Sequence, residues 1–362
     1  MEDDLRARIQ ATLRAFDDTL LGEHFALGSR IESIEIEGDR VRVVLELGFP
    51  AARYSTALAD RLKAAIGALP GVSEAKVGLT QAIPSHTAQP GLDAFRGIKN
   101  IVAVSSAKGG VGKSTVAANL ALALASEGAA VGMLDADIYG PSQPRMLGVR
   151  GKPETRDNKT FEPMVSHGIQ SMSIGYLIDE EQPMVWRGPM VTQALQQLLN
   201  ETNWRALDYL IVDMPPGTGD TQLTLSQRVP LAGAVIVTTP QDIATLDARK
   251  GLQMFNKVNV PVLGIVENMS LHVCSHCGHE EHIFGSGGGE RIAHDYQVPL
   301  LGALPLDISI RENADSGHPS VVADPEGSIA QHYRQIALRM GARLSAIAGG
   351  AGSFMPEIVD ED

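Results

Sequence analysis

The chain has 362 residues, 44% of them hydrophobic and 20% charged, so it can bury a sizeable core and is long enough for about two domains. Its formal net charge of −13 argues against electrostatic binding to nucleic acid or to an anionic membrane over a broad surface. The N-terminus is acidic and no apolar run approaches the ~20 residues of a membrane span, so we expect a cytoplasmic protein without a targeting segment.

Residues 1–81 have the pattern of a small α/β domain. Apolar residues recur at helical or alternating spacing, and Gly38 and Asp39 suit a turn between two strands. The expected elements are, in order, a helix over residues 5–16, strands over 31–36 and 41–47, a helix over 56–69 and a strand over 72–77. This order is helix, hairpin, helix, strand.

Two segments without periodicity bound the larger part of the chain. Residues 82–97 contain Pro84, Pro90 and Gly91 among polar residues, which predicts a linker. A terminal helix is expected over about 327–348, and the glycines that follow predict a mobile acidic tail over 349–362. Residues 98–348 are therefore expected to form the second domain.

In this second domain, short β-rich apolar runs alternate with helical stretches. That alternation predicts an α/β fold with a parallel sheet covered by helices on both faces. The six runs are 101–104, 130–134, 209–212, 234–237, 262–266 and 300–304. Ligands of parallel sheets bind beyond the carboxyl ends of the strands. Four runs end in polar or Gly-rich segments, so this edge of the sheet is expected to carry the site.

The clearest functional motif is the Gly-rich segment 105–115, at a strand-to-helix turn. Such a loop directs consecutive backbone N–H groups and the positive end of a helix dipole at one point, where a phosphate binds. Gly112, Lys113 and Ser114 fit the template G-x-x-x-x-G-K-S/T, and Ala107 stands at its first glycine position. The alternative is a Gly-rich turn with solvated lysines.

Individual side chains of this loop have separate expected roles. Lys113 would reach the β- and γ-phosphates, the Ser114 hydroxyl would coordinate Mg²⁺, and Thr115 would reach the α-phosphate. Lys108 is a second lysine just before the glycines, which an ordinary phosphate loop does not need.

Polar residues after three other strands are candidates for the same site. Asp213 has the position of a Walker-B carboxylate that holds the metal, with a helix or turn cap as the alternative. Asp135 and Asp137 lie two apart, on one face of an extended chain, and we favour Asp137 for orienting the attacking water; both could instead be turn aspartates. Asn268 could read a purine edge or be an ordinary turn residue.

The only two cysteines, Cys274 and Cys277, form a Cys-x-x-Cys pair. This spacing can clamp one metal centre, but tetrahedral zinc or a [4Fe–4S] cluster needs four ligands. Either nearby histidines complete a zinc site, or two chains contribute two cysteines each. A redox thiol pair is a third possibility, and the histidines could simply be solvated. The histidines in question are His272, His276, His279 and His282.

Across about residues 98–320, the motifs together resemble the Mrp family of iron–sulfur cluster carrier ATPases, and residues 1–80 resemble the small α/β domain that bacterial members carry. Besides the lysine-doubled loop and the cysteine pair, the matching motifs are 135–142, 186–190, 213–220, 238–242, 267–270 and 283–285. The resemblance implies a P-loop NTPase fold preceded by the small domain, and a homodimer that hydrolyses ATP slowly.

The resemblance also implies roles for single residues. Lys108 would reach the nucleotide of the partner chain and act with Lys113 and Asp137 in catalysis. Cys274 and Cys277 would hold a bridging [4Fe–4S] cluster together with the partner's pair. The expected nucleotide site is Lys108, Gly109, Gly110, Val111, Gly112, Lys113, Ser114, Thr115 and Asn268, with Mg²⁺ at Ser114 and Asp213.

The expected function is therefore an ATP- and Mg²⁺-dependent carrier that transfers a [4Fe–4S] cluster to apo-proteins. Its partners would be a second copy of the chain, apo iron–sulfur client proteins and assembly scaffolds, without nucleic acid or membrane. One alternative is a positioning ATPase of the partition or division type, which shares the lysine-doubled loop. Another is a zinc-binding, nucleotide-dependent scaffold.

Overall fold

The computed structural model describes residues 2–22, 24–86, 89, 92, 95–155, 159–178, 188–274 and 276–349. The chain divides into two compact units, one comprising residues 1–84, 126–128 and those from 338 on, the other 85–125 and 129–337. The linker predicted over 82–97 stays a prediction, and its described residues Ile83 and Gln89 are buried. The predicted tail lies outside the described residues from position 350 on.

The first unit confirms the predicted order of helix, hairpin, helix and strand. Strands β1 and β2 are antiparallel, and β3 runs parallel to β2. The apolar residues of α1 and α3 pack with those of β2 and with Leu338 and Ala342 in one core. The elements are α1 (Glu2–Arg14), α2 (His24–Leu27), β1 (Ser29–Glu37), β2 (Arg40–Leu47), α3 (Ser55–Gly67) and β3 (Glu74–Gln81). The short α2 has no periodic signal in the sequence.

The second unit is built on an eight-stranded sheet in the order β13-β10-β9-β4-β8-β5-β7-β6. All neighbouring strands are parallel except the β6–β7 hairpin at one edge. The strands are β4 (Ile98–Ser105), β5 (Val131–Asp135), β6 (Met164–Ser166), β7 (Ile169–Ser173), β8 (Leu207–Asp213), β9 (Gly233–Thr238), β10 (Val262–Glu267) and β13 (Leu300–Ala303). All six predicted strands are confirmed.

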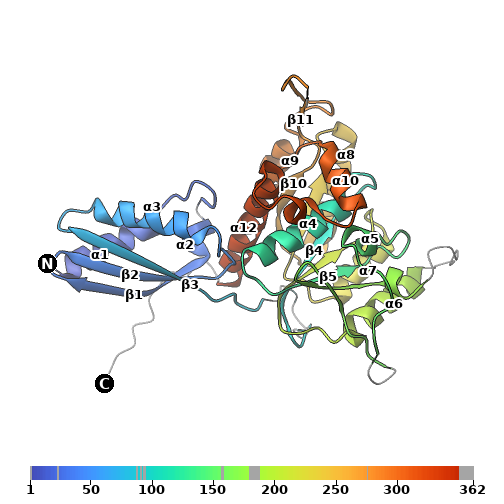
Figure 1. Cartoon of the computed structure of the whole chain (residues 1–362), viewed down its shortest axis with the longest axis horizontal. Helices are drawn as coiled ribbons and strands as arrows, with labels where there is room; N and C mark the ends of the chain where they lie inside the picture. The colour runs from blue at the N-terminus through green and yellow to red at the C-terminus, as the bar shows by residue number, and fades with distance from the viewer. Residues whose placement is uncertain are drawn as a thin grey trace. The chain divides into compact units, whose positions relative to one another are not determined.

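Helices follow most of these strands, and a small hairpin, β11 (His272–Val273) and β12 (Glu280–Glu281), follows β10 (Figure 1). The helices are α4 (Lys113–Ser126), α5 (Gln143–Met146), α6 (Gly188–Glu201), α7 (Asp220–Arg228), α8 (Asp242–Lys257), α9 (Gly288–Tyr296), α10 (Ile308–Asp315), α11 (Ser320–Ala323) and α12 (Ser328–Ala348), with a 3-10 turn η1 (Ile174–Tyr176). None of the described helices combines the length and apolar character that crossing a membrane requires.

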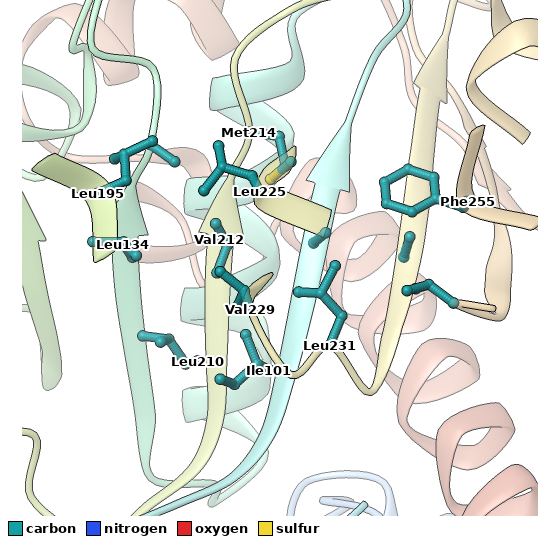
Figure 2. Close-up of a cluster of buried hydrophobic side chains, with 14 of the residues drawn as sticks. Ile101, Leu134, Leu195, Leu210, Val212, Met214, Leu225, Val229, Leu231 and Phe255 are labelled. Atoms are coloured by element: carbon teal, nitrogen blue, oxygen red, sulfur yellow. The ribbon is translucent and has the colours of Figure 1, made fainter. Parts of the chain in front are cut away.

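The core of the second unit lies on both faces of its sheet. On one face, Leu195 of α6, Leu225 of α7 and Phe255 of α8 pack over the central strands, and α4 lies behind the sheet (Figure 2). The central strand β4 is buried along almost its whole length, which is why its sequence is a continuous apolar run. This packing confirms the predicted parallel sheet covered by helices on both faces and brings the ends of β4, β5 and β8 together at one edge.

Candidate functional site

The Gly-rich segment 105–115 forms the connection between β4 and α4, as its sequence predicts. Gly110 and Gly112 have φ angles of +83° and +80°, in the left-handed region that favours glycine. A Cβ atom at Gly112 would also lie 2.3 Å from Asn268 Nδ2. Ala107, at the first glycine position of the template, is outside the left-handed region, so its methyl group causes no such strain.

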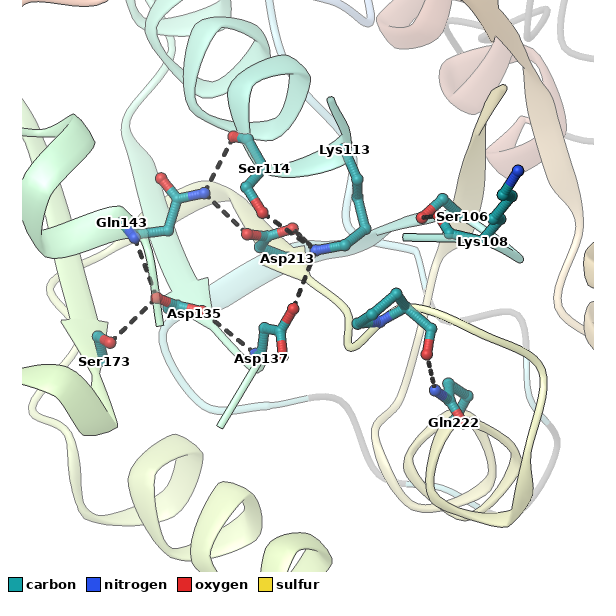
Figure 3. A network of polar contacts seen from close by, with 11 residues as sticks. Ser106, Lys108, Lys113, Ser114, Asp135, Asp137, Gln143, Ser173, Asp213 and Gln222 are labelled. Atoms are coloured by element: carbon teal, nitrogen blue, oxygen red, sulfur yellow. Dashed lines mark hydrogen bonds and ion pairs between the residues drawn. The ribbon is translucent and has the colours of Figure 1, made fainter. Parts of the chain in front are cut away.

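Lys113 is the first residue of α4, and its side chain is only 6% exposed. Its Nζ forms an ion pair with Asp213 Oδ1, donates to Ser114 Oγ at 3.2 Å and lies 4.0 Å from Asp137 Oδ2 (Figure 3). A buried ammonium group is tolerated here because carboxylates surround it. The phosphates of a nucleotide would compete with these carboxylates for the lysine.

Asp213 ends strand β8 and is fully buried. Its Oδ1 faces Lys113, and its Oδ2 accepts a hydrogen bond of 2.8 Å from Gln143 Nε2. The Ser114 hydroxyl contacts the same lysine nitrogen, so a hydroxyl and a carboxylate meet beside the phosphate loop. Such hard oxygen ligands fit Mg²⁺, which prefers one or two protein oxygens together with phosphate and water.

The two aspartates after β5 have different surroundings. Asp135 is fully buried, and its Oδ2 accepts from the backbone N–H of Gln143 and from Ser173 Oγ, both at 3.1 Å. Burial and the nearby Asp213 carboxylate raise the pKa of Asp135 above its ordinary value. Burial also raises the pKa of Asp137, against the opposing effect of Lys113. Asp135 therefore anchors the loop, whereas Asp137 is the one within ion-pair distance of the lysine.

Lys108 does not join this cluster in its own chain. Its side chain is exposed and is directed away from Lys113 (Figure 3). Its backbone carbonyl accepts a hydrogen bond of 2.9 Å from Ser106 Oγ, which holds the loop before the glycines. The amino group is thus presented to the exterior of the loop.

Asn268 follows β10 and supports the loop from the side. Its Nδ2 donates to the Val111 carbonyl at 2.9 Å, and its backbone N–H donates to the Thr238 carbonyl at 2.8 Å. In this structure the amide nitrogen of Asn268 thus bonds the loop itself. That Asn268 reads a purine edge stays a prediction. The next residue, Met269, has a φ of +58°, an uncommon conformation for a side chain of this size.

A pocket of about 360 Å³ opens beside the loop. Pockets of this size accommodate small molecules. It is lined by Gly112, Thr115, Met146, Asn268, Met269, Pro305, Leu306, Asp307, Ile310, Arg311, Ala314 and Asp315. Its methionine, leucine and isoleucine side chains suit the flat apolar faces of a nucleobase, at one end of the phosphate loop.

The cysteine pair lies in the turn of the β11–β12 hairpin. Both thiols are free; Cys274 is half-buried and Cys277 is exposed. The backbone N–H of Cys274 donates to the His279 carbonyl at 2.9 Å, and that of Gly278 donates to the Cys274 carbonyl at 2.8 Å. The backbone N–H groups of Cys277 and, secondarily, His276 lower the pKa of the Cys274 thiol, which favours the thiolate that binds metals.

Two of the surrounding histidines have a ring nitrogen within hydrogen-bond distance of a backbone carbonyl. The Nδ1 atoms of His272 and His282 lie 3.0 Å from the Leu306 carbonyl and 2.8 Å from the Ser270 carbonyl. His279 Nε2 lies 3.8 Å from Glu281 Oε1. Within the described part of the chain, no three His, Cys, Asp or Glu side chains are arranged to hold one metal ion.

Sequence reasoning missed two parts of the site. Gln143 contacts both Ser114 and Asp213, but it begins the short helix α5 and belongs to no motif that we considered. The pocket wall formed by α10 comes from residues more than a hundred positions after the loop, and only the fold brings them together. Of the matching motif 186–190, residues 186 and 187 lie outside the described residues, and Met190 is exposed.

A buried lysine on a Gly-rich loop between a central strand and a helix, paired with an aspartate at the end of the neighbouring strand in the sheet, defines a P-loop NTPase. A family model described as NUBPL iron-transfer P-loop NTPase matches residues 97–340. The chain belongs to this family. A second model, described as iron–sulfur cluster assembly protein, matches residues 6–77. The resemblance that the motifs indicated is thereby confirmed.

Curated relatives support the same assignment over most of the chain. The iron–sulfur cluster carrier protein of Escherichia coli K12 is 49% identical over 341 residues, covering 94% of this chain and 92% of that protein. The carrier protein of the same name from Pseudomonas fragi is 59% identical over 285 residues, covering 78% and 99%. The mouse iron–sulfur cluster transfer protein NUBPL is 51% identical over 254 residues, covering 70% and 80%.

Solved structures share the fold of the second unit. A nucleotide-binding protein of Archaeoglobus fulgidus in complex with ADP is 37% identical, with a TM-score of 0.57, covering 66% of this chain and 93% of that chain. The cell division ATPase MinD of Pyrococcus furiosus is 23% identical, with a TM-score of 0.51, covering 67% and 98%. The second likeness is one of fold alone, so the division-type alternative gains no functional support from it.

Proposed function

We propose that this protein is a slow ATPase that carries a [4Fe–4S] cluster between two copies of the chain and transfers it to apo-proteins, in a reducing compartment such as the cytoplasm. The observation that carries the proposal is the position of the cysteine pair. Cys274 and Cys277 are accessible and lie a short segment after Asn268, which bonds the phosphate loop. Family membership and the names of the relatives support the cargo.

The nucleotide half of the proposal rests on the polar side chains around Lys113. The loop N–H groups and Lys113 would bind the β- and γ-phosphates, Thr115 the α-phosphate, and the pocket beside Asn268 the base. Ser114 Oγ and Asp213 would hold Mg²⁺, which would neutralise phosphate charge there. Asp137 lies close enough to Lys113 to orient a water molecule near the terminal phosphate.

The cluster half of the proposal rests on ligand number. A [4Fe–4S] cluster takes four thiolates, and one chain supplies two. Among the described residues of one chain, no three His, Cys, Asp or Glu side chains are arranged to hold one metal ion, which disfavours the zinc alternative. A two-fold pair of chains would complete the ligand set, and the outward Lys108 would reach the partner's nucleotide.

Nucleotide and cluster would communicate through residues 268–274. This segment begins at the Asn268–Val111 bond, passes the strained Met269 and continues into β11. It is also tied to residues 304–306 by the bonds of Ser270 N–H to the Leu304 carbonyl and of Leu306 N–H to the Leu271 carbonyl. Movement of the phosphate loop on hydrolysis would thus reach the cysteines within one short segment.

Cluster transfer tests this proposal directly. The protein is reconstituted anaerobically with iron and sulfide, freed of excess reagents, and mixed with apo-aconitase in the presence of an iron chelator. We expect aconitase activity to recover with the loaded wild-type protein and not with the Cys277→Ala variant carried through the same steps. Equal recovery with both proteins, or none with the loaded wild type, would contradict the carrier role.

A further inference from the structure

One buried side chain beside the phosphate loop belongs to none of the motifs above. Gln143 begins α5 and is fully buried. Its Nε2 donates to Asp213 Oδ2 at 2.8 Å and to the Ser114 backbone carbonyl at 3.0 Å (Figure 3). Both partners are acceptors, so the amide must present its NH₂ group to them, which fixes its orientation. The side chain therefore bridges the aspartate and the first turn of α4.

The backbone of Gln143 is held in place as well. Its N–H donates to Asp135 Oδ2 at 3.1 Å, and the same carboxylate accepts from Ser173 Oγ at 3.1 Å. A side chain has little rotational freedom when its backbone is held by a hydrogen bond and both N–H groups of its amide donate hydrogen bonds. Gln143 is thus a rigid support for the groups that it contacts.

The remaining polar atom of Gln143 points to a ligand. Its Oε1 is buried and has no hydrogen-bond partner among the described residues. Leaving a buried acceptor unpaired costs about 1–3 kcal/mol, so native proteins usually satisfy such atoms. A water molecule on a metal ion at Ser114 and Asp213 would be a suitable donor.

We propose that Gln143 is a positioning residue of the nucleotide–Mg²⁺ site. It holds Asp213 by Oδ2 and so keeps Oδ1 turned toward Lys113. When phosphate draws the lysine away, the Gln143 bond remains to fix the orientation of the carboxylate for the metal. Groups that orient metal-binding carboxylates in this way affect metal affinity although they do not touch the metal. The inference rests on the nucleotide part of the proposed function.

Binding of a fluorescent ADP analogue, titrated once with Mg²⁺ and once with EDTA, tests this role without requiring turnover. The variant is Gln143→Met, which keeps the volume and loses the amide. The matched control is Gln89→Met, since Gln89 is also buried and donates two bonds to backbone carbonyls, of Ser226 and Val258, but contacts neither Ser114 nor Asp213. The ratio of the affinity with Mg²⁺ to the affinity with EDTA measures the contribution of the metal. We expect this ratio to fall about tenfold in Gln143→Met, while its affinity in EDTA stays that of the wild type. The Gln89→Met control should keep the wild-type affinity in both conditions.

Three results would overturn the inference. The first is a Gln143→Met variant that keeps the full Mg²⁺ effect, and the second is one that loses affinity equally with Mg²⁺ and with EDTA. The third is a loss of the Mg²⁺ effect on Gln143→Met substitution that is just as large when Asp213 is already replaced by asparagine. If Gln143→Met does not fold, Gln143→Asn replaces it, and an undiminished Mg²⁺ effect in that variant overturns the inference too. A wild-type protein without any Mg²⁺ effect would instead contradict the proposed nucleotide site itself, and this inference with it.

Discussion

Replacing Lys113 with alanine should abolish ATP hydrolysis and weaken ATP binding about 10- to 100-fold, whereas Lys108→Ala should slow hydrolysis at least about tenfold and leave ATP affinity within about twofold. The reason is their placement. Lys113 is buried beside Asp213 and Asp137, where the phosphates would bind, whereas Lys108 is exposed and directed away from the site of its own chain. Equilibrium binding and steady-state phosphate release measure the two effects separately.

The lysine experiment needs two controls. Lys250→Ala removes an exposed positive charge that pairs with the nearby Asp247, and it should leave both quantities unchanged. Circular dichroism should show that Lys113→Ala folds, because this change leaves the buried Asp213 without its cation. Normal hydrolysis by Lys108→Ala would show that its proposed action on the partner's nucleotide is wrong.

The second large effect concerns the thiols. Cys274→Ala should take up no iron or sulfide on anaerobic reconstitution, because the loss of one thiolate from each of the two chains removes two of the four ligands of a shared cluster. ATP affinity should stay within about twofold, since the cysteines lie on the β11–β12 hairpin, outside the pocket and the phosphate loop. Iron and sulfide analysis and the absorbance near 400 nm measure the loss.

Histidine variants separate the cluster from the zinc alternative. His276→Ala and His279→Ala should bind as much iron and sulfide as the wild type. Metal analysis that instead finds one zinc per chain, and no iron after reconstitution, would contradict the carrier role. Loss of that zinc in the His276 or His279 variant would assign the histidines as its ligands.

Most of the fold follows from patterns that local physics imposes. The six strands of the central sheet were predictable because strands buried on both faces must be apolar throughout, as β4 is. The β6–β7 hairpin was not, since its two short strands at the sheet edge contain serine and glutamine among their residues. Near the N-terminus, the strands and longer helices of the first unit were predictable from alternating and helical spacing. The helix α2 was not, because its four residues are too few to show a periodic pattern.

The candidate site was predictable where chemistry is local in sequence. The loop 105–115 and Asp213 could be assigned because a phosphate loop and a strand-end carboxylate each have a recognisable context. Gln143 could not, because its importance comes from contacts with Ser114 and Asp213 that only the folded chain creates. Asn268 was a candidate because it follows a strand, but its bond to Val111, which spans more than 150 residues, could not be predicted.

Native mass spectrometry of the anaerobically reconstituted protein, combined with iron, sulfide and zinc analysis, tests the shared-cluster claim most directly. We predict a species with the mass of two chains plus about four iron and four sulfide. It should revert to single chains without iron when Cys274 is replaced by alanine. Iron and sulfide bound in full to single chains, or zinc in place of iron, would contradict the claim that two chains share one [4Fe–4S] cluster.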